Sequence, residues 1–199
     1  MSAALRTRLK IADLTAWTAL DTGRRLLPPG HALERLVREE LVLFEPASGF
    51  AADAFEKPLL HAIERSNFFV NPNKEQFRFL TSSSRGESME PLPGAWGIVA
   101  RARDATEDRA LLERLLREHP MEGLGAIRKA RIWWLWTRGP DGGSAVAACF
   151  EALGPVRGSG RGLLANPHSE ATLLLEGAVP WSAIEEFVIQ PAPAHGVAA

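Results

Sequence analysis

FFVNPNKEQFRFL at residues 68–80 has a close counterpart in GLLANPHSEATLLL at residues 162–175. Each stretch places Asn-Pro between an apolar run and a run typical of a strand. Because proline disfavours the helical conformation at the residue before it, each Asn-Pro predicts a turn that leaves a helix and enters a strand. In the first of these strands we expect Phe77 and Phe79 to point inward. The recurrence predicts that the chain contains one structural unit twice.

The elements that precede each Asn-Pro also come in the same order. In the first half, strand patterns alternate with helical patterns at residues 5–11, 12–27, 36–46 and 51–66. The second half repeats this order at residues 95–102, 108–119, 128–138 and 144–154. We therefore expect an α+β chain of two tandem ferredoxin-like β-α-β-α-β units that form a pseudo-two-fold pair.

Composition predicts where these units begin and end. We assign residues 1–80 to the first unit and residues 95–176 to the second. Residues 81–94 are rich in Ser, Gly and Pro and offer almost nothing to bury, which predicts a linker. Residues 177–199 form a C-terminal extension and tail, and its apolar residues are expected to pack as a short element: Trp181, Ile184, Phe187 and Val188.

Apolar spacing also predicts which faces are buried. In the helix at 12–27, Leu14, Trp17 and Leu20 are spaced for one buried face. The strand at 128–138 is apolar on both faces, with Trp134 on one and Trp133 on the other. One face is covered by helices, so we expect the other to pack on the first half. The pattern leaves open whether the two sheets stack face to face or join edge to edge.

Composition and charge narrow the function classes. The chain has 199 residues, 46% of them hydrophobic and 24% charged, which is ordinary for a soluble globular protein. A net charge of -1 gives no basic surplus for nucleic acid, and no apolar run is long enough to span a bilayer. The start shows no secretory signal and the lone Cys149 forms no internal disulfide, so a cytoplasmic location is expected.

Motifs for catalysis, cofactors and metals are not found in the sequence. The five histidines are scattered, and neither a phosphate-binding P-loop nor a nucleophile elbow is present. We therefore expect no catalytic residues, no cofactor and no metal. A glycine-rich segment at 154–162 offers a possible anion-binding site through Arg157 and Arg161, with a plain surface loop as the alternative.

The two Asn-Pro motifs are the remaining candidate site. Their structural interpretation is a repeated turn, and the alternative is a docking role for the exposed tips. The residues concerned are Asn71, Pro72, Asn73, Lys74 and Glu75 in the first motif, and Asn166, Pro167 and Glu170 in the second.

The second motif resembles the C-terminal signature of the PurS subunit family of phosphoribosylformylglycinamidine synthase. Members of that family typically end with a helix, then LLANP, two variable residues, an acidic residue and a final strand. This chain matches the signature at Leu163, Leu164, Ala165, Asn166, Pro167 and Glu170. The first half matches it more loosely at Asn71, Pro72 and Glu75.

The resemblance implies a non-catalytic subunit built from two tandem PurS-like units. Proteins of this family hold glutaminase and synthetase subunits together, so that ammonia from glutamine reaches formylglycinamide ribonucleotide in an ATP-dependent amidation. We therefore expect a bridging role in purine biosynthesis, with those two subunits as partners and with further homo-oligomers possible. The alternative is a regulatory module that binds a small molecule, and a stand-alone enzyme is the third hypothesis.

Overall fold

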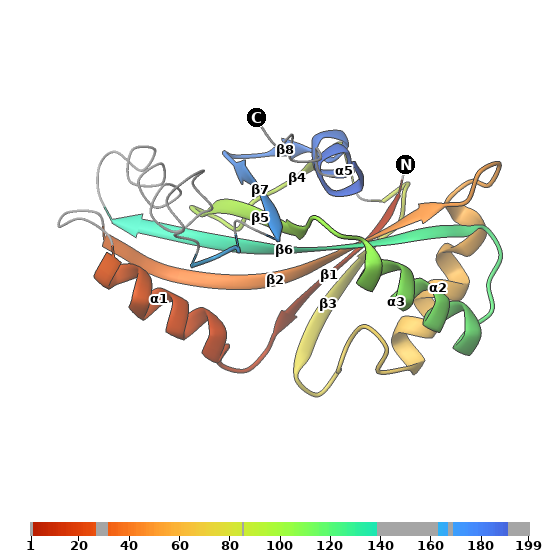
Figure 1. Ribbon diagram of the computed structural model, residues 1–199, viewed down its shortest axis with the longest axis horizontal. Helices are drawn as coiled ribbons and strands as arrows, with labels where there is room; N and C mark the ends of the chain where they lie inside the picture. The colour runs from red at the N-terminus through yellow and green to blue at the C-terminus, as the bar shows by residue number, and fades with distance from the viewer. Residues whose placement is uncertain (1, 27–31, 85, 139–162, 167–168, 191–199) are drawn as a thin grey trace, which may run out of the picture.

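The computed structural model describes residues 2–26, 32–84, 86–138, 163–166 and 169–190 (Figure 1). These residues form an α+β fold, as the sequence predicts. Its centre is a six-stranded sheet in which every neighbouring pair is antiparallel. The spatial order is β3-β1-β2-β6-β5-β7, and the strands are β1 (Ala3–Leu9), β2 (Ala32–Pro46), β3 (Glu75–Leu80), β5 (Trp96–Ala102), β6 (Leu124–Arg138) and β7 (Glu170–Leu175).

The two halves of the chain join edge to edge through β2 and β6. Each of these strands is 15 residues long, and their pairing runs from Ala32 opposite Arg138 to Pro46 opposite Leu124. Each half contributes its third, first and second strand in turn, so the strand order is the same from either edge. The expectation that the second apolar face of β6 packs on the first half is wrong, because the halves meet through backbone pairing within one sheet.

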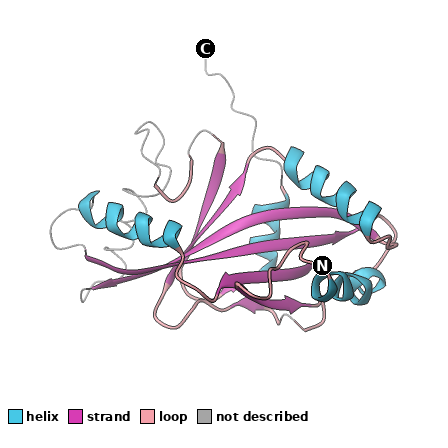
Figure 2. Cartoon of the chain, turned by 90° about the horizontal axis from the view of Figure 1, so that it is seen from below, coloured by secondary structure: helices cyan, strands magenta, loops and turns pink. Residues whose placement is uncertain are grey.

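Helices cover the two faces of the sheet unequally. Three helices lie on one side, which we call the helix face: α1 (Leu14–Leu26), α2 (Asp53–Arg65) and α3 (Thr106–Glu118) (Figures 1 and 2). The other side, the α5 face, carries α5 (Trp181–Ile189) and a small second sheet of β4 (Ser88–Met89) and β8 (Val179–Pro180). Within the described ranges, no helix combines the length and apolar character needed to cross a membrane.

The core follows the alternation of β6. Trp134 and Ile132 are buried on the α5 face, where Trp181 and Ile184 pack with them. Trp133 and Leu135 are buried on the helix face in a cluster that includes residues of α1. A third cluster joins α2 and α3 to β1, β2 and the start of β6, and its largest buried members are Leu5, Phe44, Phe55, Leu59 and Leu115. The prediction that both faces of β6 are buried is confirmed.

The segment between the halves is packed, which differs from the expected linker. Met89 is buried, Leu92 packs against the α5-face cluster, and the Trp136 indole donates a hydrogen bond to the Pro93 carbonyl at 3.0 Å. These residues find apolar partners because the C-terminal extension folds back over them as β8 and α5. The predicted packing of the extension is confirmed, and residues 191–199 lie outside the described part of the chain.

Two expectations about buried faces are wrong. In α1, Leu14 is 70% exposed and Trp17 is 69% exposed, whereas Ala16 and Ala19 are buried. Small side chains let the helix lie close to the sheet, so Ala16 and Ala19 make the contact together with Leu20, the one predicted residue that packs there. On β3, Phe77 is exposed although Phe79 packs against the cluster around α2.

Candidate docking surface

A groove of about 540 Å³ lies between the start of α1, the loop before it and the first part of β2. The pairing of β1 with β2 ends at Thr7, which lies opposite Glu40. Beyond that pair, β2 remains paired with β6 as far as Ala32, and the groove lies along this part of β2. Among the described residues, no strand pairs with residues 35–39 on the side facing β1, whereas the carbonyls of Leu33 and Glu34 accept hydrogen bonds from Arg24. The groove therefore runs beside an open strand edge, which is a common place for another chain to bind.

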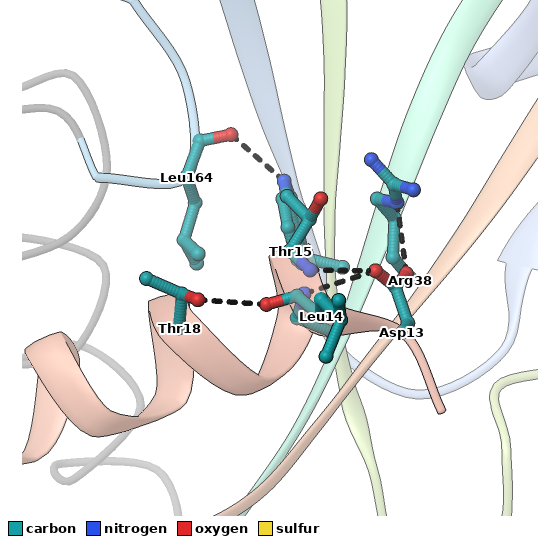
Figure 3. Close-up of polar contacts among 8 residues, drawn as sticks. Asp13, Leu14, Thr15, Thr18, Arg38 and Leu164 are labelled. Carbon is teal, nitrogen blue, oxygen red and sulfur yellow. Dashed lines mark hydrogen bonds and ion pairs between the residues drawn. The ribbon is translucent and has the colours of Figure 1, made fainter.

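Asp13 builds the first turn of α1 and ties it to β2 (Figure 3). Its Oδ1 accepts hydrogen bonds from the backbone N–H groups of Thr15 at 3.0 Å and Ala16 at 3.1 Å, which satisfies donors that have no partner within the helix. Its Oδ2 accepts a hydrogen bond from Arg38 Nε at 3.0 Å. One side chain thus caps the helix and fixes its position over β2.

The other end of α1 is held by Arg24. Its Nε donates to the Leu33 carbonyl at 2.8 Å, and its second amino group donates to the Glu34 carbonyl at 2.7 Å. Both acceptors belong to β2. Because α1 is fixed at both ends and packs through Ala16 and Ala19, its opposite face is presented to solvent at a defined place.

Three large apolar side chains are exposed here, Leu14 and Trp17 on that face and Ile11 in the loop before α1. Ile11 is 57% exposed, and Leu14 and Trp17 are 70% and 69% exposed. Single exposed apolar residues are normal on proteins, but a group of three beside a groove is typical of an interaction site. Tryptophan is also among the residues that most often supply binding energy in interfaces.

The rim of the groove is basic. Arg8, Lys10, Arg35 and Arg38 line it against one acidic side chain, Asp13. The Arg35 guanidinium lies 4.6 Å from the centre of the Trp136 ring. This cation-π contact orients the side chain without neutralising its positive charge. An apolar surface with a basic rim is complementary to an apolar segment that carries carboxylates.

Glu40 lies near Arg38 of the basic rim, and it forms the last residue pair between β1 and β2, opposite Thr7. Burial raises the pKa of its carboxyl, and the neighbouring guanidiniums of Arg131 and Arg38 act in the opposite direction. Burial is the larger effect, since the net shift is upward.

No protein-family model, curated protein or solved structure matches this chain.

The two Asn-Pro motifs make the same hydrogen bonds. The Asn71 backbone N–H donates to Glu75 Oε2 at 2.6 Å, and the Glu75 N–H donates to the Asn71 carbonyl at 2.7 Å. Asn166 and Glu170 repeat both contacts at the same two distances. Each motif is thus a reciprocally bonded turn that enters the edge strand of its half.

The first turn borders the groove. Lys10, which lines the groove, donates its backbone N–H to the Lys74 carbonyl and its Nζ to the Pro72 carbonyl, both at 2.8 Å. Asn73 and Lys74 are exposed beside it. The structure therefore places the tip of the first motif, a predicted docking element, beside Lys10 at the rim of the groove.

The second motif lies on the other half of the sheet but also reaches α1. Glu170 Oε1 accepts a hydrogen bond from Arg131 at 2.9 Å. Leu164, two residues before Asn166, packs in the cluster that contains Ala16 and Ala19, and its carbonyl accepts from the Trp133 indole at 2.7 Å (Figure 3). Four further predicted residues, Cys149, Arg157, Arg161 and Pro167, lie outside the described residues.

Sequence reasoning missed the groove, because it placed Leu14 and Trp17 in the core. The sequence did contain a signal for a basic surface in this region. Arg6, Arg8 and Lys10 alternate with mostly apolar positions in the first strand and the following loop. Within the described ranges, no three His, Cys, Asp or Glu side chains are arranged to hold a metal ion. The arrangement offers a surface for binding another chain.

Proposed function

We propose that this chain is a non-catalytic bridging subunit that resembles PurS and acts in the cytoplasm. In this proposal, the two halves are tandem ferredoxin-like units related by a pseudo-two-fold axis. They hold glutaminase and synthetase subunits of a phosphoribosylformylglycinamidine synthase together. The observation that supports it is the pair of identical Asn-Glu turns in two halves that join through one antiparallel strand pair.

The difference between the two halves favours a bridge between unlike partners. Helices α1 and α3 both have 13 residues and follow the first strand of their half. Aligned from their first residues, Trp17 of α1 corresponds to Arg109 of α3, and Leu14 corresponds to Thr106. The helix of the first half therefore presents apolar side chains where that of the second presents polar ones. Such a duplicated frame can hold two different proteins.

Charge favours a partner over a second copy of this chain in the groove beside α1. Two copies that met through this surface would bring basic rim against basic rim, and like charges in an interface cost several kcal/mol. We therefore propose that the occupant is a partner segment with apolar side chains flanked by Asp or Glu. The open edge of β2 allows that segment to bind in extended form.

The test uses the full-length chain and the purified glutaminase and synthetase subunits from the same source. The wild-type chain is expected to form a complex with both. Trp17→Ala should weaken binding to one of them by about 2 kcal/mol or more, roughly 30-fold, as expected for an interface tryptophan. Arg109→Ala, at the corresponding position of α3, is the matched control and should leave that contact unchanged.

Two results separate the parts of the proposal. If neither purified subunit binds the wild-type chain, the PurS-like function is wrong. If a subunit binds and Trp17→Ala has no more effect than Arg109→Ala, the bridging function stands and the groove beside α1 is not its docking surface.

A further inference from the structure

A second cavity, of about 470 Å³, lies over β1 and β3, and the small second sheet and α5 supply part of its wall. Arg6, Arg8, Gln76 and Arg78 line it from the strands, and residues 88–92 and Trp181 line it from the other side. Its volume is within the range of pockets that bind metabolites, about 300–1,000 Å³. This cavity shares Arg8 and Gln76 with the groove beside α1, and its other lining residues are different.

A buried carboxylate anchors its basic side chains. Glu39 is only 7% exposed, and its Oε2 accepts hydrogen bonds from Arg6 Nε at 3.1 Å and from the Trp134 indole at 2.9 Å. Its other oxygen, Oε1, lies 4.0 Å from a terminal nitrogen of Arg8. Glu39 thus neutralises Arg6 directly and Arg8 only at the limit of an ion pair.

The strand register then adds a like charge. Arg78 of β3 lies directly opposite Arg6 of β1, and Gln76 lies directly opposite Arg8. Like charges directly opposite each other destabilise a sheet. The Arg78 side chain is exposed and, within the described part of the chain, makes no hydrogen bond or ion pair. Three guanidiniums therefore face the cavity against two carboxylates, Glu39 in the floor and Glu90 in the wall.

We propose that this cavity binds a small organic anion. Its carboxylate or phosphate group would lie between Arg8 and Arg78, since the planar guanidinium binds both kinds of oxyanion through paired hydrogen bonds. The anion would offset the charge of Arg78 and the part of the Arg8 charge that Glu39 leaves unbalanced. Arg8 is already oriented, because the Gln76 amide, turned with its oxygen toward Arg8, accepts hydrogen bonds from Nε at 2.8 Å and from a terminal nitrogen at 2.6 Å.

The rest of the ligand would be apolar. Pro91 and Leu92 line the cavity and are only half-buried, whereas Leu80 and Met89, which also line it, are already buried. A free inorganic anion would use the arginines and leave this apolar wall in contact with water. The ligand class is therefore an oxyanion with an apolar body. It would give the chain the small-molecule-binding role that the sequence offers as an alternative, at a place different from Arg157 and Arg161.

Isothermal titration calorimetry of the full-length chain tests the proposal with three probes: phenyl phosphate, phenylacetate and inorganic phosphate. Phenyl phosphate, phenylacetate or both should bind with a Kd below about 1 mM, and the one that binds more tightly identifies the head group. Inorganic phosphate should bind about tenfold more weakly than phenyl phosphate where phenyl phosphate binds, because it lacks the apolar body.

Arg78→Ala is the test variant, since this exposed side chain holds nothing in the described fold. It should weaken binding of the better organic probe about tenfold or more, a loss of ~1.4 kcal/mol or more. The unfolding midpoint should not fall below that of the wild type, because the change also removes the like charge opposite Arg6. Arg65→Ala removes the same charge from an exposed position at the end of α2, outside the cavity, and should change the Kd less than twofold.

Three outcomes would overturn the proposal. The first is that neither organic probe binds at about 10 mM, well above the expected Kd. The second is that Arg65→Ala weakens binding as much as Arg78→Ala, which would indicate attraction to the overall charge alone. The third is that inorganic phosphate binds as tightly as the better organic probe, which would exclude a ligand with an apolar body.

Discussion

Glu40 of β2 lies directly opposite Arg131 of β6, at the seam between the two halves. Each is also the last residue of its strand to pair with the first strand of its own half, Glu40 with Thr7 and Arg131 with Ala100. The two residues therefore occupy corresponding positions in the two halves. Glutamate occupies this position in the first half and arginine occupies it in the second, so the β2–β6 pair joins residues of opposite charge where the two halves correspond.

The raised pKa of Glu40 predicts a pH-dependent stability. Because burial raises its pKa above the ordinary value of 4.5, the folded protein keeps this proton to higher pH than the unfolded chain does. The free energy of unfolding contributed by Glu40 therefore falls as pH rises from 4.5 through the folded pKa. Glu40→Gln should be more stable than the wild type near pH 7, and this advantage should disappear near pH 4.

Urea unfolding at the two pH values measures this difference. Glu64→Gln, an exposed change on α2, serves as the control and should show no such dependence. A Glu40→Gln variant that is less stable than the wild type at pH 7 would contradict the prediction. It would mean that attraction to Arg131 outweighs the cost of burial.

The repeated turns predict that removing either glutamate lowers the free energy of unfolding, and that the two effects are independent. Glu75→Ala removes the carboxylate that accepts the Asn71 N–H, and should lower the free energy of unfolding by about 1–2 kcal/mol. Glu170→Ala removes the corresponding contact and the ion pair with Arg131, so its loss should be larger. The two turns lead into opposite edges of the sheet, so the double variant should show the sum within about 0.5 kcal/mol. Equilibrium denaturation of the three variants would expose any departure from additivity.

The buried contact between Glu39 and Arg6 predicts that removing one charge destabilises the fold, whereas replacing both charges restores much of the stability. Glu39→Ala leaves Arg6 and the Trp134 indole without their acceptor, and should destabilise the fold by about 3–5 kcal/mol. Combining Glu39→Leu with Arg6→Met replaces both charges with apolar groups of similar size, and should recover much of that stability. Thermal unfolding of the single and double variants decides the point. A double variant as unstable as Glu39→Ala would show that the charges themselves are required.

Two tryptophans differ in burial, which predicts a small effect on stability for one and a large loss for the other. Trp17 is 69% exposed, so Trp17→Ala should change the free energy of unfolding by no more than about 0.5 kcal/mol. Trp134 is fully buried in the cluster under α5, so Trp134→Ala should cost about 3–5 kcal/mol. Chemical denaturation measures both. A large loss for Trp17→Ala would mean that this side chain serves the fold rather than an interface.

Much of the architecture was predictable from local patterns. The helix α3 was expected from its leucines, and Leu115 is buried with Leu111, Leu112 and Leu116 packed around it. The two-sided burial of β6 followed from its alternation. The docking surface was not predictable, because apolar spacing in α1 is compatible with burial of either side. The packing of Met89 was missed because its partners, β8 and α5, come about 90 residues later in the chain.

The sequence by itself determined the element order of the first half, the alternation of β6 and the repeated Asn-Pro motif, because these depend on backbone and side-chain preferences over a few residues. The helix expected at residues 144–154 lies outside the described residues. Only the tertiary structure decided that β2 pairs with β6, that α1 turns Trp17 to solvent and that Arg6 faces Arg78. The physical reason is that strand edges carry the same hydrogen-bonding groups whatever the sequence. Their pairing and register are selected by packing between distant segments.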